Sequence, residues 1–208
     1  MSYYFDYGAT SLKKPKEVAD KVYEVLSSGK YANASRGSYY EANNAFREVY
    51  EARKAVADFF GLKEEDRVVF TSNSTESLNI AIFGLLNKED HVVTTSMEHN
   101  SVLRPIYLAH ETIGCDYTIV RGDKTGMISY EDLEAAIKPN TKILAITHSS
   151  NVTGNVIDLD KVATICKKHN IISVVDASQT AGVIPINMEE LGIDVLCFTG
   201  HKSLYGPQ

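Results

Sequence analysis

Reactive side chains follow five short apolar runs of this sequence, and each run is typical of a buried β-strand. In open parallel sheets, ligands bind in the crevice outside the carboxyl ends of the strands. We therefore expect these side chains to line one crevice. In chain order, the polar segments that follow the runs are residues 71–76, 98–100, 148–151, 176–179 and 199–202.

Lys202 ends a Thr-Gly-His-Lys loop that directly follows the apolar run 195–198. A lysine at the end of a buried strand is partly desolvated, and desolvation favours its neutral amine. A neutral amine can attack a carbonyl group and form a Schiff base. An ordinary surface lysine after a strand is the alternative, and the loop alone does not exclude it.

Asp176 ends the strand-like run 171–175. Because burial of an unpaired charge is costly, its carboxylate needs a partner, and a salt bridge or a helix cap would supply one. A functional partner is the ring nitrogen of a heterocycle, which a carboxylate keeps protonated so that the ring withdraws electrons. Asp176 and Lys202, at neighbouring strand ends, are the pair that pyridoxal phosphate chemistry requires.

The segment 71–76 reads as the start of a helix. Asn73 is a suitable N-cap, and Glu76 follows it by three residues, as in a capping box. Ser74 and Thr75 add hydroxyl groups to the free N–H groups of a first turn, which suits an anion and above all phosphate. Plain helix capping explains the same residues. The sequence lacks G-x-G-x-x-G and G-x-x-x-x-G-K-[ST], which counts against dinucleotides and P-loop nucleotides.

His99 lies at a strand-to-helix turn, where an imidazole could stack on a cofactor ring and move protons. A solvated loop histidine is the more common arrangement. Three other histidines and all three cysteines lack the spacing of a metal site, so we expect structural roles for them and no metal. These residues are His91, His110, His169, Cys115, Cys166 and Cys197.

The composition indicates an ordinary globular protein of 208 residues, with 44% hydrophobic and 23% charged residues. The net charge of -6 comes from mixed signs without basic runs, so nucleic acid is not an expected partner. No stretch approaches the roughly 20 apolar residues of a membrane span, and the N-terminus does not resemble a signal peptide. We expect a cytoplasmic protein without a membrane partner.

The hydrophobic pattern predicts an α/β fold with a predominantly parallel, three-layer α/β/α sheet. Residues 1–66 form an N-terminal arm followed by two helices, over 15–28 and 40–60, and residues 67–208 form the cofactor-binding domain. In that domain, strands and helices alternate. The predicted strands are 68–70, 91–94, 117–120, 143–147, 171–175 and 195–198, and the predicted helices are 74–86, 101–113, 129–138 and 158–169.

Six ordered segments resemble the class V group of fold-type I pyridoxal phosphate enzymes, and within it the cysteine desulfurase and selenocysteine lyase branch. The resemblance covers the whole chain. It rests on residues 4–10, similar to an Asp-Asn-Ala-Ala-Thr arm, and on 71–79, 98–102, 150–154, 175–179 and 199–202.

The resemblance implies that Lys202 holds pyridoxal 5'-phosphate as a Schiff base and later transfers the α-proton of the substrate. It implies that Asp176 pairs with the pyridine nitrogen and that Gln179 hydrogen-bonds the ring oxygen. His99 would stack on the ring, and Asn151 would lie beside the substrate carboxylate or the ring oxygen. The residues implied to hold the phosphate are Ser74, Thr75, Thr199 and His201.

The implied reaction takes sulfur from cysteine as an enzyme persulfide and leaves alanine. In the family, the accepting thiol lies well beyond the lysine, together with a small domain and an antiparallel strand of the sheet. We therefore expect this chain to be an N-terminal fragment, incomplete at its C-terminus and without the small domain. Tyr39 stands where many members of the family have histidine, so this position leaves the choice of substrate open.

Two other interpretations stay open. A class V aminotransferase or an amino-acid β-lyase would share all six motifs, and a non-catalytic dimerisation or interaction module is a third possibility. The resemblance further implies a homodimer and a sulfur-acceptor protein, such as a scaffold for iron–sulfur cluster assembly.

Overall fold

The computed structural model describes residues 3–207, so residues 1–2 and 208, at the ends of the two predicted domains, lie outside it. The chain divides into two compact units. Unit 1 comprises the described residues up to Phe70, residues 185–190 and the residues from Gly200 onward. Unit 2 comprises Thr71–Ile184 and Leu191–Thr199. The predicted boundary between residues 66 and 67 stays a prediction.

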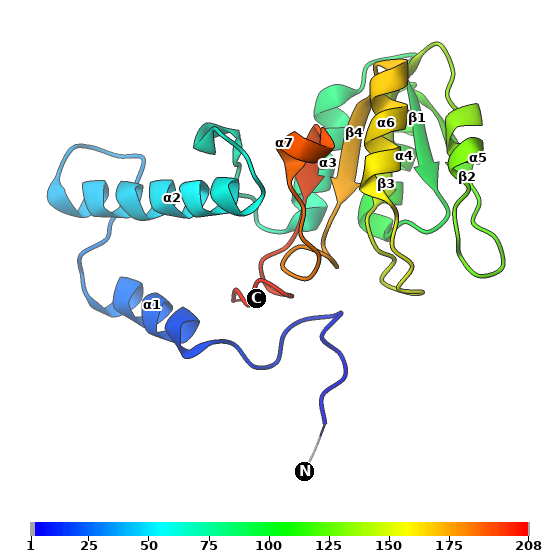
Figure 1. Ribbon diagram of the computed structural model, residues 1–208. Helices are drawn as coiled ribbons and strands as arrows, with labels where there is room; N and C mark the ends of the chain where they lie inside the picture. The colour runs from blue at the N-terminus through cyan, green and yellow to red at the C-terminus, as the bar shows by residue number, and fades with distance from the viewer. Residues whose placement is uncertain (1–2, 208) are drawn as a thin grey trace. The chain divides into compact units, whose positions relative to one another are not determined.

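Unit 2 is built on a sheet that has five strands within the described residues (Figure 1). Their order is β2-β1-β3-β4-β5, and every neighbouring pair is parallel. The parallel α/β architecture that the sequence predicts is therefore confirmed. The strands are β1 (His91–Thr95), β2 (Asp116–Val120), β3 (Thr141–Thr147), β4 (Ile172–Asp176) and β5 (Val195–Cys197).

Helices cover both faces of this sheet, with α6 in front of β3 and β4 in the view of Figure 1 and α3 and α4 on the far side. All four predicted helices of this unit form. The one over 129–138 is shorter than expected. The helices are α3 (Ser74–Leu85), α4 (Asn100–Ile113), α5 (Tyr130–Ala135) and α6 (Leu159–His169).

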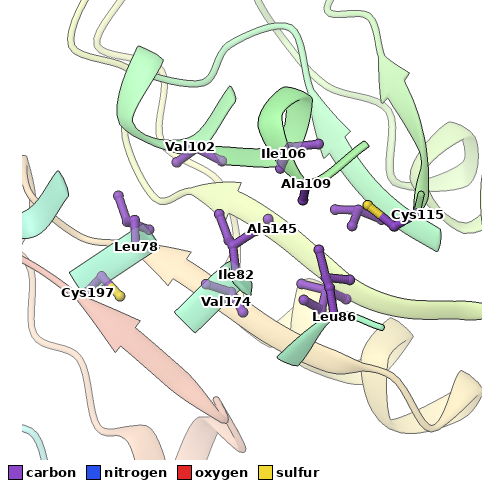
Figure 2. Packing of buried hydrophobic residues seen from close by; sticks show 12 residues of the cluster. Leu78, Ile82, Leu86, Val102, Ile106, Ala109, Cys115, Ala145, Val174 and Cys197 are labelled. Atoms are coloured by element: carbon purple, nitrogen blue, oxygen red, sulfur yellow. The ribbon is translucent and has the colours of Figure 1, made fainter. Parts of the chain in front are cut away.

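The core between the sheet and helices α3 and α4 is apolar and closely packed, as Figure 2 shows. Leu78 and Ile82 on α3 and Ile106 on α4 are fully buried. They meet the inward side chains of the strands, among them Ala145 on β3 and Val174 on β4. Side chains two residues apart on a strand share a face, so Asp176 lies on the same face as Val174, toward α3.

Unit 1 contains the arm, α1 (Lys16–Ser27), α2 (Tyr40–Phe59) and the short 3-10 helix η1 (Glu65–Arg67). Lys21 on α1 pairs with Glu48 on α2 at 2.8 Å. Gly61 ends the second helix with a φ of 71°, and a Cβ at this position would overlap the side chain of Asn187. This position therefore requires glycine both for its backbone and for the close approach.

Three features of the structure differ from the prediction. The run 68–70 forms no strand, because no strand among the described residues pairs with it and Val69 is 70% exposed. Helix α1 forms as predicted, but its apolar face is not buried, and Leu26 is 80% exposed. Helix α7 (Met188–Leu191) was not predicted, because four residues are too few to show a helical period.

None of the described helices combines the length and the apolar character that a membrane crossing requires.

Candidate cofactor site

Asp176 is the last residue of β4, and it is only 4% exposed. Its backbone is held on both sides, because its carbonyl oxygen accepts from His148 N at 2.9 Å and the next residue donates to Cys197 O at 2.8 Å. Its Oδ1 accepts from Ser178 N at 2.9 Å and from Ser178 Oγ at 2.6 Å. The carboxylate is therefore fixed at the centre of the strand ends.

The first turn of α3 is capped as the sequence predicts. Asn73 Oδ1 accepts from Glu76 N at 3.0 Å. The carboxylate of Glu76 accepts in return from Ser72 N at 2.6 Å, one residue before the cap, and this hydrogen bond lowers the pKa of Glu76. The cap leaves the hydroxyl groups of Ser74 and Thr75 to other partners.

Each of these two hydroxyl groups is hydrogen-bonded to a serine, and that serine is hydrogen-bonded to a predicted ring-binding residue. Ser74 Oγ lies 2.8 Å from Ser178 Oγ, which also bonds Asp176. Thr75 Oγ1 lies 2.7 Å from Ser101 Oγ, which in turn lies 2.8 Å from His99 Nδ1. The predicted phosphate turn is thus hydrogen-bonded to each predicted ring group through a separate serine.

His99 is the N-cap of α4, and its Nδ1 accepts from Ser101 N at 3.1 Å. A neutral imidazole that accepts at Nδ1 carries its proton on Nε2. The rest of the ring is exposed to solvent at the strand-end edge. His99 therefore presents a flat ring and one N–H donor.

The other predicted residues of unit 2 lie at the ends of β3, β4 and β5. Asn151 is exposed in the turn after β3, which is closed by a hydrogen bond from Ser150 N to Asn155 O at 3.0 Å. Gln179 is half-buried three residues after Asp176. Thr199 is 8% exposed and follows β5 by two residues.

Lys202 and His201 belong to unit 1, where the N-terminal arm holds the loop that carries them. The carbonyl oxygen of His201 accepts from Ser11 N at 3.2 Å and from Thr10 Oγ1 at 3.0 Å. Burial lowers the pKa of His201, and the charges of Lys202 and Lys14 lower it further. The arm therefore packs against this loop, and Lys202 itself is half-buried.

Glu98 is a half-buried acid to which the sequence pattern assigned no role. Its Oε1 accepts from Thr95 Oγ1 at 2.6 Å, and its Oε2 is buried without a hydrogen-bond partner among the described residues. Burial raises the pKa of this carboxyl group to about 8, and the charge of Asp176 adds to the rise. The hydrogen bond from the Thr95 hydroxyl and the polar backbone of Thr147 oppose this rise.

Ser101, Ser178 and His148 had no predicted role, although the segments 148–151 and 176–179 were expected to line the crevice. Both serines donate a backbone N–H to a polar side chain two residues earlier, and this i to i+2 spacing is the signal that could have identified them. His148 is 4% exposed and lies 2.8 Å from Thr180 Oγ1, at the end of the turn that carries Gln179. Burial lowers the pKa of His148 and favours its neutral form.

The histidines and cysteines that were expected to be structural have structural contacts. His91 is fully buried between Thr141 and Thr118, at 2.7 and 2.9 Å. His110 bonds a backbone carbonyl, and His169 bonds Glu134. The three cysteines are buried and unpaired, and burial raises the pKa of each thiol. Within the described part of the chain, no group of His, Cys, Asp and Glu is suited to hold a metal ion.

The comparisons with known proteins point to one family. The profile of the aminotransferase class-V family matches residues 3–208. The cysteine desulfurase IscS of Dictyoglomus turgidum is 35% identical over 211 residues, covering 99% of this chain and 52% of that protein. The cysteine desulfurase IscS of Enterobacter sp. is 36% identical over 210 residues, again with 99% of this chain covered and 51% of the relative.

Solved structures agree in fold. The apo cysteine desulfurase of Thermococcus onnurineus is similar with a TM-score of 0.91 and 37% identity, over 99% of this chain and 51% of that one. SspA in complex with cysteine also has a TM-score of 0.91, with 33% identity over 100% of this chain and 59% of that one. The chain spans about half the length of the curated relatives it matches. With its profile match, its relatives and its parallel sheet in agreement, the chain belongs to the aminotransferase class-V family.

Proposed function

We propose that this chain is the cofactor-binding part of a pyridoxal phosphate-dependent cysteine desulfurase. The observation that carries the proposal lies at the strand ends of unit 2, where two adjacent helix-start hydroxyls are linked through serines, one to a buried carboxylate and the other to an exposed imidazole. Relatives at about 35% identity that are named cysteine desulfurases support the choice of reaction.

The residues present fit pyridoxal 5'-phosphate. The free N–H groups of the first turn of α3 and the hydroxyls of Ser74 and Thr75 suit a phosphate dianion. Asp176 is a buried, hydrogen-bonded carboxylate of the kind that holds a pyridinium N–H. When bound, the cofactor supplies a ring that takes up the negative charge developing at the α-carbon of the substrate.

In this proposal each side chain has a defined role. Asp176 keeps the proton on the ring nitrogen, and Gln179 donates a hydrogen bond to the ring oxygen. His99 covers one face of the ring and donates from Nε2. Lys202 anchors the cofactor through its amine and moves the α-proton of the substrate, and Asn151 binds the substrate carboxylate or the ring oxygen. Thr199 and His201 complete the phosphate site.

The sulfur acceptor in this proposal is a cysteine outside these 208 residues. An enzyme thiol can attack the substrate sulfur only as a thiolate. Burial raises the pKa of Cys166 and of Cys197 to about 12 and also raises that of Cys115. One cysteine substrate and one enzyme thiol then yield one alanine and one enzyme persulfide.

We further propose a homodimer and a separate protein that takes the sulfur, with iron–sulfur cluster assembly as one destination, in the cytoplasm. Large apolar side chains on α1 and α2 support the dimer, because they stay exposed in unit 1. They include Tyr23 at 74%, Leu26 at 80% and Phe46 at 59% exposed.

The test begins with cofactor binding by the complete protein. Reconstitution with pyridoxal 5'-phosphate is expected to give a protein-bound absorbance band, and borohydride reduction followed by peptide mass mapping is expected to find the label on Lys202. Lys202→Ala should abolish the label, whereas Lys167→Ala, a matched change of an exposed lysine on α6, should leave it intact. A protein that binds no cofactor would refute the proposal.

The reaction is tested with cysteine as the substrate. We expect equal amounts of alanine and protein-bound persulfide. A keto acid in place of alanine would contradict desulfuration and point to an aminotransferase or a β-lyase.

A further inference from the structure

Ser101 and Ser178 have no task in the proposed mechanism, yet each lies between two residues that do. Ser178 Oγ is within 2.8 Å of Ser74 Oγ and within 2.6 Å of Asp176 Oδ1. Ser101 Oγ is within 2.7 Å of Thr75 Oγ1, and it also reaches His99. A hydroxyl has one proton and two lone pairs, so it can serve both neighbours at once.

The turn after β4 does not need the hydrogen bond from Ser178 Oγ to Asp176. Ser178 N already donates to Asp176 Oδ1 at 2.9 Å, which closes the turn after β4 without help from the side chain. The hydroxyl adds a link to α3, an element 104 residues away in sequence. Since turn closure does not need the hydroxyl, its contribution is to fix the carboxylate relative to the first turn of α3.

The second bridge has the same construction. Ser101 N donates to His99 Nδ1 at 3.1 Å and caps α4. Ser101 Oγ lies 2.8 Å from the same nitrogen and extends the contact to Thr75, 26 residues earlier. Ser101 is 8% exposed, so water does not readily replace this hydroxyl.

We propose that Ser101 and Ser178 are positioning residues, two hydroxyl bridges that tie the phosphate turn of α3 to His99 and to Asp176. The inference rests on the proposed function for the identity of the ligand. Through the bridges, a phosphate on Ser74 and Thr75 orders the imidazole and the carboxylate before the ring reaches them. Binding at one end of the cofactor thereby prepares the other end.

The first measurement is the dissociation constant of pyridoxal 5'-phosphate for the complete protein. Ser178→Ala and Ser101→Ala each remove one bridge and keep the backbone N–H, so we expect each to weaken binding by about 5- to 10-fold. Ser178→Thr keeps the hydroxyl and should restore affinity to within about 2-fold of wild type. Thr164→Val removes a hydroxyl that bonds only within α6 and should change nothing.

A double-mutant cycle then separates a bridge from two independent contacts. In a Ser74→Ala background the link is already broken, so adding Ser178→Ala should weaken binding by less than about 2-fold. If Ser178→Ala weakens binding by the same factor in both backgrounds, the two serines act independently and the inference is overturned.

The second measurement needs no cofactor. Nitrogen-15 NMR of the cofactor-free protein should show the Nε2-protonated tautomer of His99 with a hydrogen-bonded Nδ1. Ser101→Ala should shift the Nδ1 resonance and raise the share of the other tautomer. Unchanged His99 resonances in Ser101→Ala would refute this bridge. If wild type binds no pyridoxal 5'-phosphate, the proposed function fails and the NMR result alone decides the inference.

Discussion

Replacing Glu98 by glutamine is expected to remove a pH dependence from the stability of unit 2. In the folded chain the pKa of Glu98 is about 8, against 4.5 for an ordinary glutamate, and burial is the largest cause. The unfolded chain therefore releases this proton at lower pH than the folded chain does. Between the two pKa values the folded state binds more protons, so stability falls as the pH rises.

The size of the effect follows from the gap between the two pKa values. At 1.36 kcal/mol per pKa unit, a gap of about 3.5 corresponds to about 5 kcal/mol, all of it present below pH 4.5 and lost above pH 8. Glutamine fills the same volume and has no proton to lose. The stability of Glu98→Gln relative to wild type should therefore rise by about 1.4 kcal/mol per pH unit between pH 5 and 7.5.

Urea unfolding of the complete, cofactor-free protein, followed by circular dichroism at several pH values, measures this difference. Glu76→Gln is the matched control, because the hydrogen bond from Ser72 N lowers the pKa of Glu76. That stabilisation is complete above the ordinary glutamate pKa of 4.5 and is lost only below it, so the control should show no trend between pH 5 and 7.5. A Glu98→Gln difference that stays constant from pH 5 to 7.5 would refute the reasoning.

Further predictions concern the core, the cap, the ring carboxylate and the thiols. Leu78→Ala should cost about 2–5 kcal/mol of unfolding free energy in urea, because Leu78 is fully buried. Asn73→Ala should cost about 1 kcal/mol in the same assay, since it removes the cap of α3. Asp176→Asn should weaken pyridoxal phosphate binding by about 10- to 100-fold in a fluorescence titration, through loss of a charge-assisted hydrogen bond. Cys166 and Cys197 should resist iodoacetamide at pH 8 until urea unfolds the protein, because their pKa values are about 12.

The sheet was predictable because its strands are buried on both faces and read as continuous apolar runs. Val92 and Val93 on β1 are both fully buried, as are Val174 and Val175 on β4. The run 68–70 has the same composition, but a strand also needs a neighbour, and composition does not report one. For the same reason, the helical period placed α1 correctly but could not tell whether its apolar face is covered.

The site was predictable in part. Asp176 ends β4 and His99 lies in the turn after β1, at the edge of a parallel sheet where ligands bind. No role was predicted for Ser101 or Ser178, because local capping alone explains a serine near a helix start or a turn. Their hydroxyls bond across 26 and 104 residues of sequence, and only the folded chain brings those positions together. The roles of the site residues stay predictions until the cofactor experiments are done.

Helix α3 joins the candidate site to the hydrophobic core, because its first turn carries Ser74 and Thr75 and its next turns carry Leu78 and Ile82. A ligand held at that first turn stabilises the folded state by about 2.7 kcal/mol at a concentration 100 times its dissociation constant. Amide hydrogen exchange that requires opening of the whole unit should then slow by about 100-fold. The amides of β1, β3 and β4 would report occupancy of the site although they lie in the middle of the sheet.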